Sequence, residues 1–198
     1  MTHINKFHHR KTIRLKGYDY SQSGFYYVTV CTQNRECLLG EIIDRKMVLN
    51  EIGEIVDKWW LEIPKRFNGI KLDKYQLMPN HIHGIIIINN RDNGRENRDN
   101  GRENRAPTLG KIIAYFKYQS TKQINQYLVG AGIIPPSGII PSSGVTSSES
   151  IIPNNKKIFQ RNYYEHIIRN ENELNAIRQY IIDNPKNWAK DENNPNLI

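Results

Sequence analysis

The sequence predicts an α+β fold: a ferredoxin-like antiparallel sheet with helices packed on it. Segments rich in aromatic and β-branched residues, typical of strands, occupy residues 24–34, 70–78 and 81–88. Two segments with helical periodicity lie between or just after these strands, and a third helix follows near the C-terminus. An antiparallel sheet with helices segregated on it is typical of α+β proteins. Because 198 residues suit one domain of ordinary size, we treat residues 1–198 as a single domain.

The first predicted strand, "GFYYVTVCTQN" at residues 24–34, is followed by a short hairpin in "LLGEIIDRKMVLN" at residues 38–50. Residues 70–78 form the next strand, "MPN" supplies a turn, and "HIHGIIII" returns as a central strand that is apolar on both faces.

Each predicted helix begins at a capping residue. Asn50 precedes a helix that runs to Pro64, with an apolar stripe that includes Trp59 and Trp60 as core residues. Thr108 precedes a second helix, and Lys111, Lys117 and Lys122 lie off its apolar stripe. That stripe consists of Leu109, Ile112, Ile113, Phe116, Ile124, Tyr127 and Leu128. Asn170, followed by Glu173, resembles a capping box before a third helix that we expect Pro185 to end.

The charge of the chain favours polyanionic partners. Its 28 Lys and Arg against 20 Asp and Glu give a formal charge of +8, which makes nucleic acid the first candidate. Residues 1–17 form a basic N-terminal arm that either lies along phosphates or is a solvated terminus. No segment suits a signal peptide or a membrane span, so we expect a cytoplasmic protein without a membrane partner. We expect Cys31 and Cys37 to be packing residues in a reducing compartment.

Two low-complexity segments, residues 89–107 and 129–157, are predicted to be flexible insertions. The first repeats "NRDNGRE" without apolar positions, which excludes a coiled coil, and its five Arg are nearly balanced by four acids. The second repeats "GIIP" among Ser and Pro residues. The net positive charge therefore lies on the rest of the chain.

His81 and His83 are the first candidate site residues. Alternation along a strand sends both imidazoles to one face, where a single divalent metal can bridge them. The alternative is a pair of hydrogen-bonded core histidines. On the last helix, Tyr180 and Asn184 are four residues apart and share a face, although Tyr180 can equally be a core tyrosine and Asn184 a helix-end residue.

Three motifs in this order, "MPNHIHGIIII", "FQRNYYEHIIRNENEL" and "QYIIDNP", resemble the REP-associated tyrosine transposases, within the single-tyrosine (Y1) HUH transposases. The resemblance extends from about Ile13 to Trp188 and implies an HUH-endonuclease fold. It implies that His81, His83 and Asn184 hold Mg²⁺ or Mn²⁺, that Ile82 is the apolar middle residue of the HUH motif, and that Tyr180 is the catalytic nucleophile. Phe159, where many relatives carry tryptophan, and the expanded loops depart from the family pattern.

The resemblance further implies a transposase that cleaves and rejoins single-stranded hairpin or repeat-associated DNA through a 5′-phosphotyrosine, as a monomer or homodimer. Imidazole ligands suit Mn²⁺ better than Mg²⁺, so we expect higher activity with Mn²⁺. Two alternatives remain: a non-catalytic protein of the same fold that binds structured nucleic acid, and a metal-dependent hydrolase with another substrate.

Further residues are candidates for DNA binding or for packing. We expect DNA contacts from Arg10, Lys11, Arg14, Lys117, Arg161 and Tyr163. Arg161, Tyr163 and the neighbouring Tyr164 can instead brace the sheet edge. Tyr115 is predicted to pack in the core, and His166 to be structural rather than a third ligand.

Overall fold

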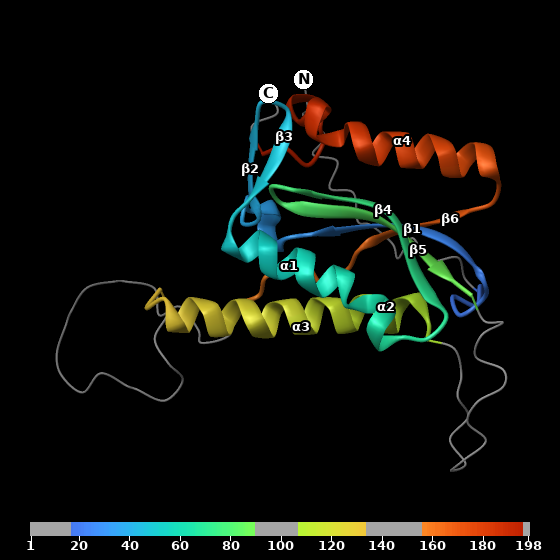
Figure 1. Ribbon diagram of the computed structural model, residues 1–198, viewed down its shortest axis with the longest axis horizontal. Coiled ribbons are helices and arrows are strands. Elements are labelled where there is room, and N and C mark those ends of the chain that lie inside the picture. The colour runs from blue at the N-terminus through green and yellow to red at the C-terminus, as the bar shows by residue number, and fades with distance from the viewer. Residues whose placement is uncertain (1–16, 90–106, 134–155, 196–198) are drawn as a thin grey trace, which may run out of the picture.

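Four antiparallel strands form the central sheet of the computed structural model (Figure 1), which describes residues 17–89, 107–133 and 156–195. The strands lie in the order β4-β5-β1-β6, and each neighbouring pair is antiparallel. They are β1 (Gly24–Cys31), β4 (Ile70–Met78), β5 (His81–Ile88) and β6 (Tyr164–Ile168). The main helix α1 (Glu51–Leu61) and the short α2 (Ile63–Arg66) lie between β1 and β4, and α3 (Leu109–Gly130) lies between β5 and β6. With α1 and α3 as its two helices, this is the β-α-β-β-α-β arrangement of ferredoxin-like folds. The predicted fold class is confirmed.

The predicted hairpin is present but forms a sheet of its own. Strands β2 (Gly40–Ile43) and β3 (Lys46–Leu49) pair with each other and not with the central sheet. Asp44 and Arg45 at its tip have φ values of 48° and 62°. A two-residue turn with positive φ at both positions matches the twist of a hairpin, so this connection is a tight turn despite its non-glycine residues. A 3-10 helix, η1 (Gln33–Arg35), separates β1 from this hairpin.

Helices cover both faces of the central sheet. Figure 1 shows α1 and α3 running beside each other on one face and α4 on the other. The first face carries α1 (Glu51–Leu61), the short α2 (Ile63–Arg66) and α3 (Leu109–Gly130). The second carries α4 (Glu171–Asn187), which continues into the 3-10 helix η3 (Trp188–Lys190). The sheet therefore has two separate apolar layers, and the face under α4 carries the candidate site.

The predicted helix starts are confirmed by side-chain caps. Asn50 accepts a hydrogen bond from the backbone N–H of Gly53, and Thr108 and Asn170 cap α3 and α4 in the same way. The capping box of α4 is modified, because Glu173 accepts from the N–H of Arg169 and from His166 rather than from its cap residue.

Two predictions, on the end of α4 and on the packing of the cysteines, are wrong. Pro185 does not end α4, which continues to Asn187. A proline lacks the N–H that would bond to the carbonyl four residues before it, and its ring crowds that carbonyl, so it disfavours a helix without forbidding one. Pro185 is buried, and α4 continues for two residues beyond it. Cys37 is exposed rather than packed, because it lies in the loop after η1, and Cys31 is only partly buried.

The larger core lies between the sheet and helices α1 and α3. Trp60 and Phe116 are fully buried there with their rings edge to face, and Ile82 and Ile86 of β5 pack from the sheet. Trp59 is partly buried and donates its indole N–H to Gln123. Both tryptophans are therefore core residues, as predicted. The smaller core, under α4, contains Tyr27, Ile85, Ile168, Leu174 and Ile181.

Gly84 is required where β5 passes under Trp60. A Cβ at this position would lie 2.2 Å from Cζ2 of the indole. We expect Gly84→Ala to lower the free energy of unfolding by about 1–3 kcal/mol, because the fully buried ring has little room to move. Urea denaturation measures the change. Gly130→Ala is the matched control, since a Cβ there meets no atom within 4 Å and stability should stay the same or rise slightly. Equal urea midpoints for Gly84→Ala and wild type would contradict this account.

Other expectations lie outside the described residues. These are the basic arm with Arg10, Lys11 and Arg14, and most of the two predicted insertions, at residues 90–106 and 134–155. Residues 129 and 130, which were predicted to open the second insertion, belong to α3 instead. Within the described ranges, no helix combines the length and the apolar character needed to cross a bilayer.

Candidate metal and nucleophile site

His81 and His83 project together from β5 toward α4. Their side chains are 0% and 2% exposed, and their Nε2 atoms lie 2.9 Å apart. Two ligands at right angles around one metal, each ~2.1 Å from it, would be ~3.0 Å apart. The spacing fits a shared cation, and it also fits a hydrogen bond between the two rings. The protonation of the other ring nitrogens separates these two cases.

The neighbours of His81 leave its Nε2 free to bind a metal. Its Nδ1 lies 2.8 Å from Oδ1 of Asn80. The amide nitrogen of Asn80 donates to the carbonyls of Arg35 and Asn193, at 2.9 and 2.7 Å, which fixes the oxygen toward His81. An oxygen without a proton can only accept, so Nδ1 carries the hydrogen and Nε2 of neutral His81 presents a lone pair.

Hydroxyl groups surround the corresponding nitrogen of His83. The Tyr27 hydroxyl lies 2.7 Å from Nδ1, and Oγ1 of Thr29 lies 2.9 Å from it. A hydroxyl accepts as readily as it donates, so this pair permits the same Nδ1–H form for His83. Both histidines can then direct lone pairs at one point. Oxygens that hydrogen-bond to the far ring nitrogen commonly impose this arrangement on metal-binding histidines.

The environment keeps both imidazoles neutral. Burial lowers the pKa of His81 to about 3, and the charge of Arg35 contributes. Burial also lowers the pKa of His83 well below its ordinary value, with a further contribution from His81. Because a histidine must be neutral to bind a metal, both groups are in the required state at neutral pH without the metal having to displace a proton.

Asp191 brings a carboxylate to the histidines. Its Oδ2 lies 3.9 Å from Nε2 of His81, and the side chain is 5% exposed. That separation is too long for a hydrogen bond, but two ligands of one cation can be up to ~4.2 Å apart. The ligand atoms of His81, His83 and Asp191 all lie within 4.8 Å of one another. Two imidazoles and a carboxylate make a donor set that fits a divalent transition metal such as Mn²⁺.

Asp191 was not predicted from the sequence, because it lies in the tail after α4 and η3, which has no periodic pattern. Contacts far apart in the chain hold this tail in place. Arg35 donates to the carbonyl of Glu192 at 2.9 Å, and Asn80 donates to that of Asn193. Oδ1 of Asp191 accepts from the backbone N–H and the side-chain amide of Asn193, which leaves Oδ2 to face the histidines. No local signal in the sequence could have revealed these contacts.

Tyr180 of α4 lies beside the histidine pair. Its ring centroid is 5.3 Å from that of His83, and the residue is 49% exposed. Burial raises the pKa of its phenol, while hydrogen bonding from the Asn184 side chain opposes the rise. The phenol is therefore protonated at neutral pH, next to the candidate metal ligands and open to solvent on one side.

Asn184 is 3% exposed and lies one helical turn after Tyr180. Its Oδ1 is fully buried and has no hydrogen-bond partner among the described residues. A buried amide oxygen without a partner costs free energy unless something binds it. This orphaned oxygen fits the role of a metal ligand that was predicted for Asn184.

The ion pair between Arg178 and Asp73 anchors the helix that carries Tyr180. The guanidinium donates to Oδ2 of Asp73 at 2.6 and 2.9 Å, which links α4 to a bulge in β4. The site thus combines a strand that positions two imidazoles, a helix that positions a phenol and an amide, and a tail that positions a carboxylate.

Comparison with known proteins bears on the family and the fold of the chain. No protein-family model matches the chain. An uncharacterized protein of Haemophilus influenzae is 36% identical over 195 residues, covering 93% of each chain. The chain belongs to the same family as that protein. A solved structure of a REP-associated tyrosine transposase bound to a REP hairpin matches with a TM-score of 0.53 at 16% identity, covering 88% of this chain and 73% of that one. The resemblance found in the motifs is therefore confirmed at the level of the fold.

The residues predicted to contact DNA occupy different environments. Nζ of Lys117 donates to the carbonyls of Gln160 and Asn162, at 2.8 and 3.0 Å, and reaches that of Arg161 at 3.4 Å. Burial lowers the pKa of Lys117 to about 8, and the nearby Cys31 partly opposes this shift. Tyr163 is partly buried against the larger core beneath this lysine, whereas the Arg161 side chain is exposed. DNA contact by these three residues stays a prediction.

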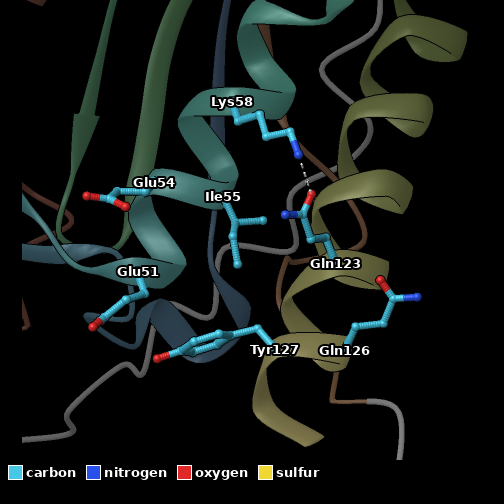
Figure 2. A pocket seen from close by; sticks show the side chains of 7 residues that line it. All are labelled: Glu51, Glu54, Ile55, Lys58, Gln123, Gln126 and Tyr127. Carbon is cyan, nitrogen blue, oxygen red and sulfur yellow. Dashed lines mark hydrogen bonds between the residues drawn. The ribbon is translucent and has the colours of Figure 1, made fainter. Parts of the chain in front are cut away.

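Figure 2 shows a groove between α1 and α3. These two helices lie on the face of the sheet opposite α4 (Figure 1). Glu51, Glu54 and Tyr127 line the groove, and Lys58 donates across it to Gln123 at 3.2 Å. None of the predicted site residues lines this groove, so the candidate site and the groove are separate.

The oxygens around His83 should control metal affinity. We expect Tyr27→Phe combined with Thr29→Val to weaken Mn²⁺ binding about 10- to 100-fold, because both hydrogen-bond partners of Nδ1 are lost. Isothermal titration calorimetry measures the affinity. Tyr26→Phe is the matched control, since that hydroxyl donates to the carbonyl of Gln22 and the ring packs in the larger core. Unchanged Mn²⁺ affinity in the double variant would show that the two hydroxyls do not position the ligand.

Proposed function

We propose that the protein is a DNA transposase, a metal-assisted endonuclease and strand transferase that acts on single-stranded hairpin or repeat-associated DNA through a tyrosine nucleophile. The observation that carries the proposal is the position of Tyr180, half exposed and 5.3 Å, ring to ring, from the buried His83. The fold match to a transposase bound to a REP hairpin supports the choice of substrate.

The proposed reaction is a phosphoryl transfer. The phenol oxygen of Tyr180 attacks phosphorus, an O–P bond forms, and the bond from phosphorus to the 3′-oxygen breaks. The phenol proton passes to water at the exposed edge of the ring, and the departing oxygen takes up a proton to become a 3′-hydroxyl. The product is a 5′-phosphotyrosine. Since one phosphodiester replaces another, a second 3′-hydroxyl can reverse the step and join strands without ATP.

The metal ligands would be His81, His83 and Asn184, with Asp191 as a further oxygen donor. A divalent metal bound there supplies positive charge that polarises the scissile phosphate. The chain positions these donors in advance through Asn80, Tyr27 and Thr29. Mixed nitrogen and oxygen ligands suit Mn²⁺ better than Mg²⁺, so we expect faster cleavage with Mn²⁺. Equal or faster cleavage with Mg²⁺ would contradict this choice.

A covalent adduct tests the proposal. The protein is incubated with a labelled library of DNA hairpins carrying single-stranded extensions in the presence of Mn²⁺, and the products are separated on a denaturing gel. We expect a protein–DNA adduct that mass spectrometry maps to Tyr180. An adduct on another residue would refute the nucleophile. Hairpin binding without any adduct across the library would favour the non-catalytic binding protein.

A further inference from the structure

Tyr164 lies in one cross-strand row with the candidate site. His83 of β5 pairs with Thr29 of β1, and Thr29 pairs with Tyr164 of β6. Directly paired residues of an antiparallel sheet share a face, so all three side chains project toward the α4 side. The backbone of Tyr164 is two strand spacings, roughly 10 Å, from that of His83. A tyrosine therefore stands at the sheet edge next to the site.

Tyr163, the preceding residue, does not face the candidate site. Tyr163 is packed against the core on the other side of the sheet, with Lys117 5.4 Å from its ring centroid. Tyr164 is instead 39% exposed, and its ring meets that of Tyr27 edge to face at 6.0 Å. Tyr27 in turn contacts Tyr180 edge to face at 6.4 Å. Three tyrosine rings thus lead from the proposed nucleophile to an open aromatic surface.

Tyr164 is open to solvent on one side, and contacts on the other side hold the neighbouring chain in place. β6 is an edge strand, and the ion pair of Arg178 with Asp73 ties α4 to β4 at the opposite edge of the sheet. Lys117 binds three consecutive carbonyls of residues 160–162, just before β6. The loop that leads into Tyr164 is therefore fixed, and a ring held in place loses little freedom when a flat partner stacks on it. Arg161 in this loop is exposed, so a positive charge stands close by.

We propose that Tyr164 is a stacking platform for a base next to the scissile phosphate, and so a binding residue of the single-stranded part of the substrate. This inference rests on the proposed function. Aromatic rings beside a positively charged path are how proteins bind unpaired bases, since every base presents a flat face. A duplex offers no free base face, so Tyr164 selects single-stranded DNA at this point.

The test uses the full chain carrying Tyr180→Phe, which binds without cleaving. Adding Tyr164→Ala should weaken binding to a hairpin with a single-stranded extension about 5- to 150-fold, the range expected for one stacked base. Tyr164→Trp should retain affinity. Tyr118→Ala is the matched control, because Tyr118 is 64% exposed but lies on α3. Binding to the same hairpin without its extension should not change in any variant.

A fluorescent base gives a second readout. 2-Aminopurine placed next to the mapped cleavage position should be quenched on binding in the parent protein and in Tyr164→Trp, but not in Tyr164→Ala. Equal affinity and quenching in Tyr164→Ala and its parent would overturn the inference. So would an equal loss of affinity for the hairpin that lacks an extension. If either of these results is found while the wild-type protein still forms an adduct at Tyr180, only the stacking role of Tyr164 fails. If the wild-type protein neither binds the extension nor forms an adduct, both the stacking role and the proposed function fail.

Discussion

Tyr180→Phe is expected to abolish the covalent protein–DNA adduct, with cleavage reduced at least about 10³-fold, and to leave hairpin affinity within about twofold of wild type. The substitution removes only the proposed attacking oxygen, and loss of a nucleophile removes the covalent step itself. The ring itself remains, so its contacts with His83 and Tyr27 are preserved. The measurement is adduct yield on a denaturing gel with Mn²⁺, alongside equilibrium binding of the same DNA.

Two tyrosines serve as controls for this result. Tyr118→Phe removes an exposed hydroxyl on α3 and should form the adduct at the wild-type rate. Tyr164 is the tyrosine that most closely precedes Tyr180 in the sequence. Tyr164→Phe removes its hydroxyl while keeping the ring, and this variant should also form the adduct. Full adduct yield from Tyr180→Phe would mean that a different side chain attacks, and would remove the main support for the transposase reaction.

His83→Ala should abolish measurable Mn²⁺ binding and reduce cleavage as severely as the loss of the nucleophile. The substitution removes one of two imidazoles whose Nε2 atoms are 2.9 Å apart, and a small cation loses a ligand that no described neighbour replaces. His81→Ala should behave in the same way. Hairpin binding should be largely spared, because basic residues rather than the metal provide most of the attraction to phosphates. Calorimetric Mn²⁺ titration and the cleavage assay measure the two effects.

The oxygen ligands should show smaller and separable effects. Asp191→Asn keeps an oxygen donor but removes its charge, and Asn184→Ala removes the orphaned amide oxygen; we expect about 10-fold weaker Mn²⁺ binding from each. His166→Ala is the control, because this imidazole bonds to Glu173 at 2.7 Å and should not affect the metal. Mn²⁺ affinity that is unchanged in His83→Ala would show that the two histidines are an ordinary hydrogen-bonded core pair.

Much of the fold could be read from local patterns. Asn50, Thr108 and Asn170 were recognised as caps because a cap depends only on the following three residues. The shared face of His81 and His83 follows from strand alternation, which tertiary structure cannot change once β5 forms. Pro185 shows the limit of such patterns. A proline disfavours a helix through its contact with the preceding turn but does not by itself fix where the helix ends, and here α4 ends two residues later.

The composition of the site depended on contacts that no local pattern encodes. Asp191 reaches the histidines because Arg35 and Asn80, more than 100 residues earlier, bind the tail. Tyr164 rather than Tyr163 faces the site because the pairing of β6 with β1 fixes which of the two neighbours points toward α4. The sequence placed both tyrosines in one motif and could not distinguish them.

The sequence by itself determined the antiparallel α+β architecture, the paired imidazoles and the i, i+4 relation of Tyr180 to Asn184, since each is a consequence of strand or helix periodicity. The tertiary structure alone decided that Tyr180 lies against His83, that Asn184 buries an oxygen without a partner among the described residues, and that Asp191 brings a carboxylate to the two histidines. The physical reason is range. Periodicity acts over a few residues, whereas a metal site needs side chains from distant segments to converge, and only packing of α4 and its tail on the sheet brings them together.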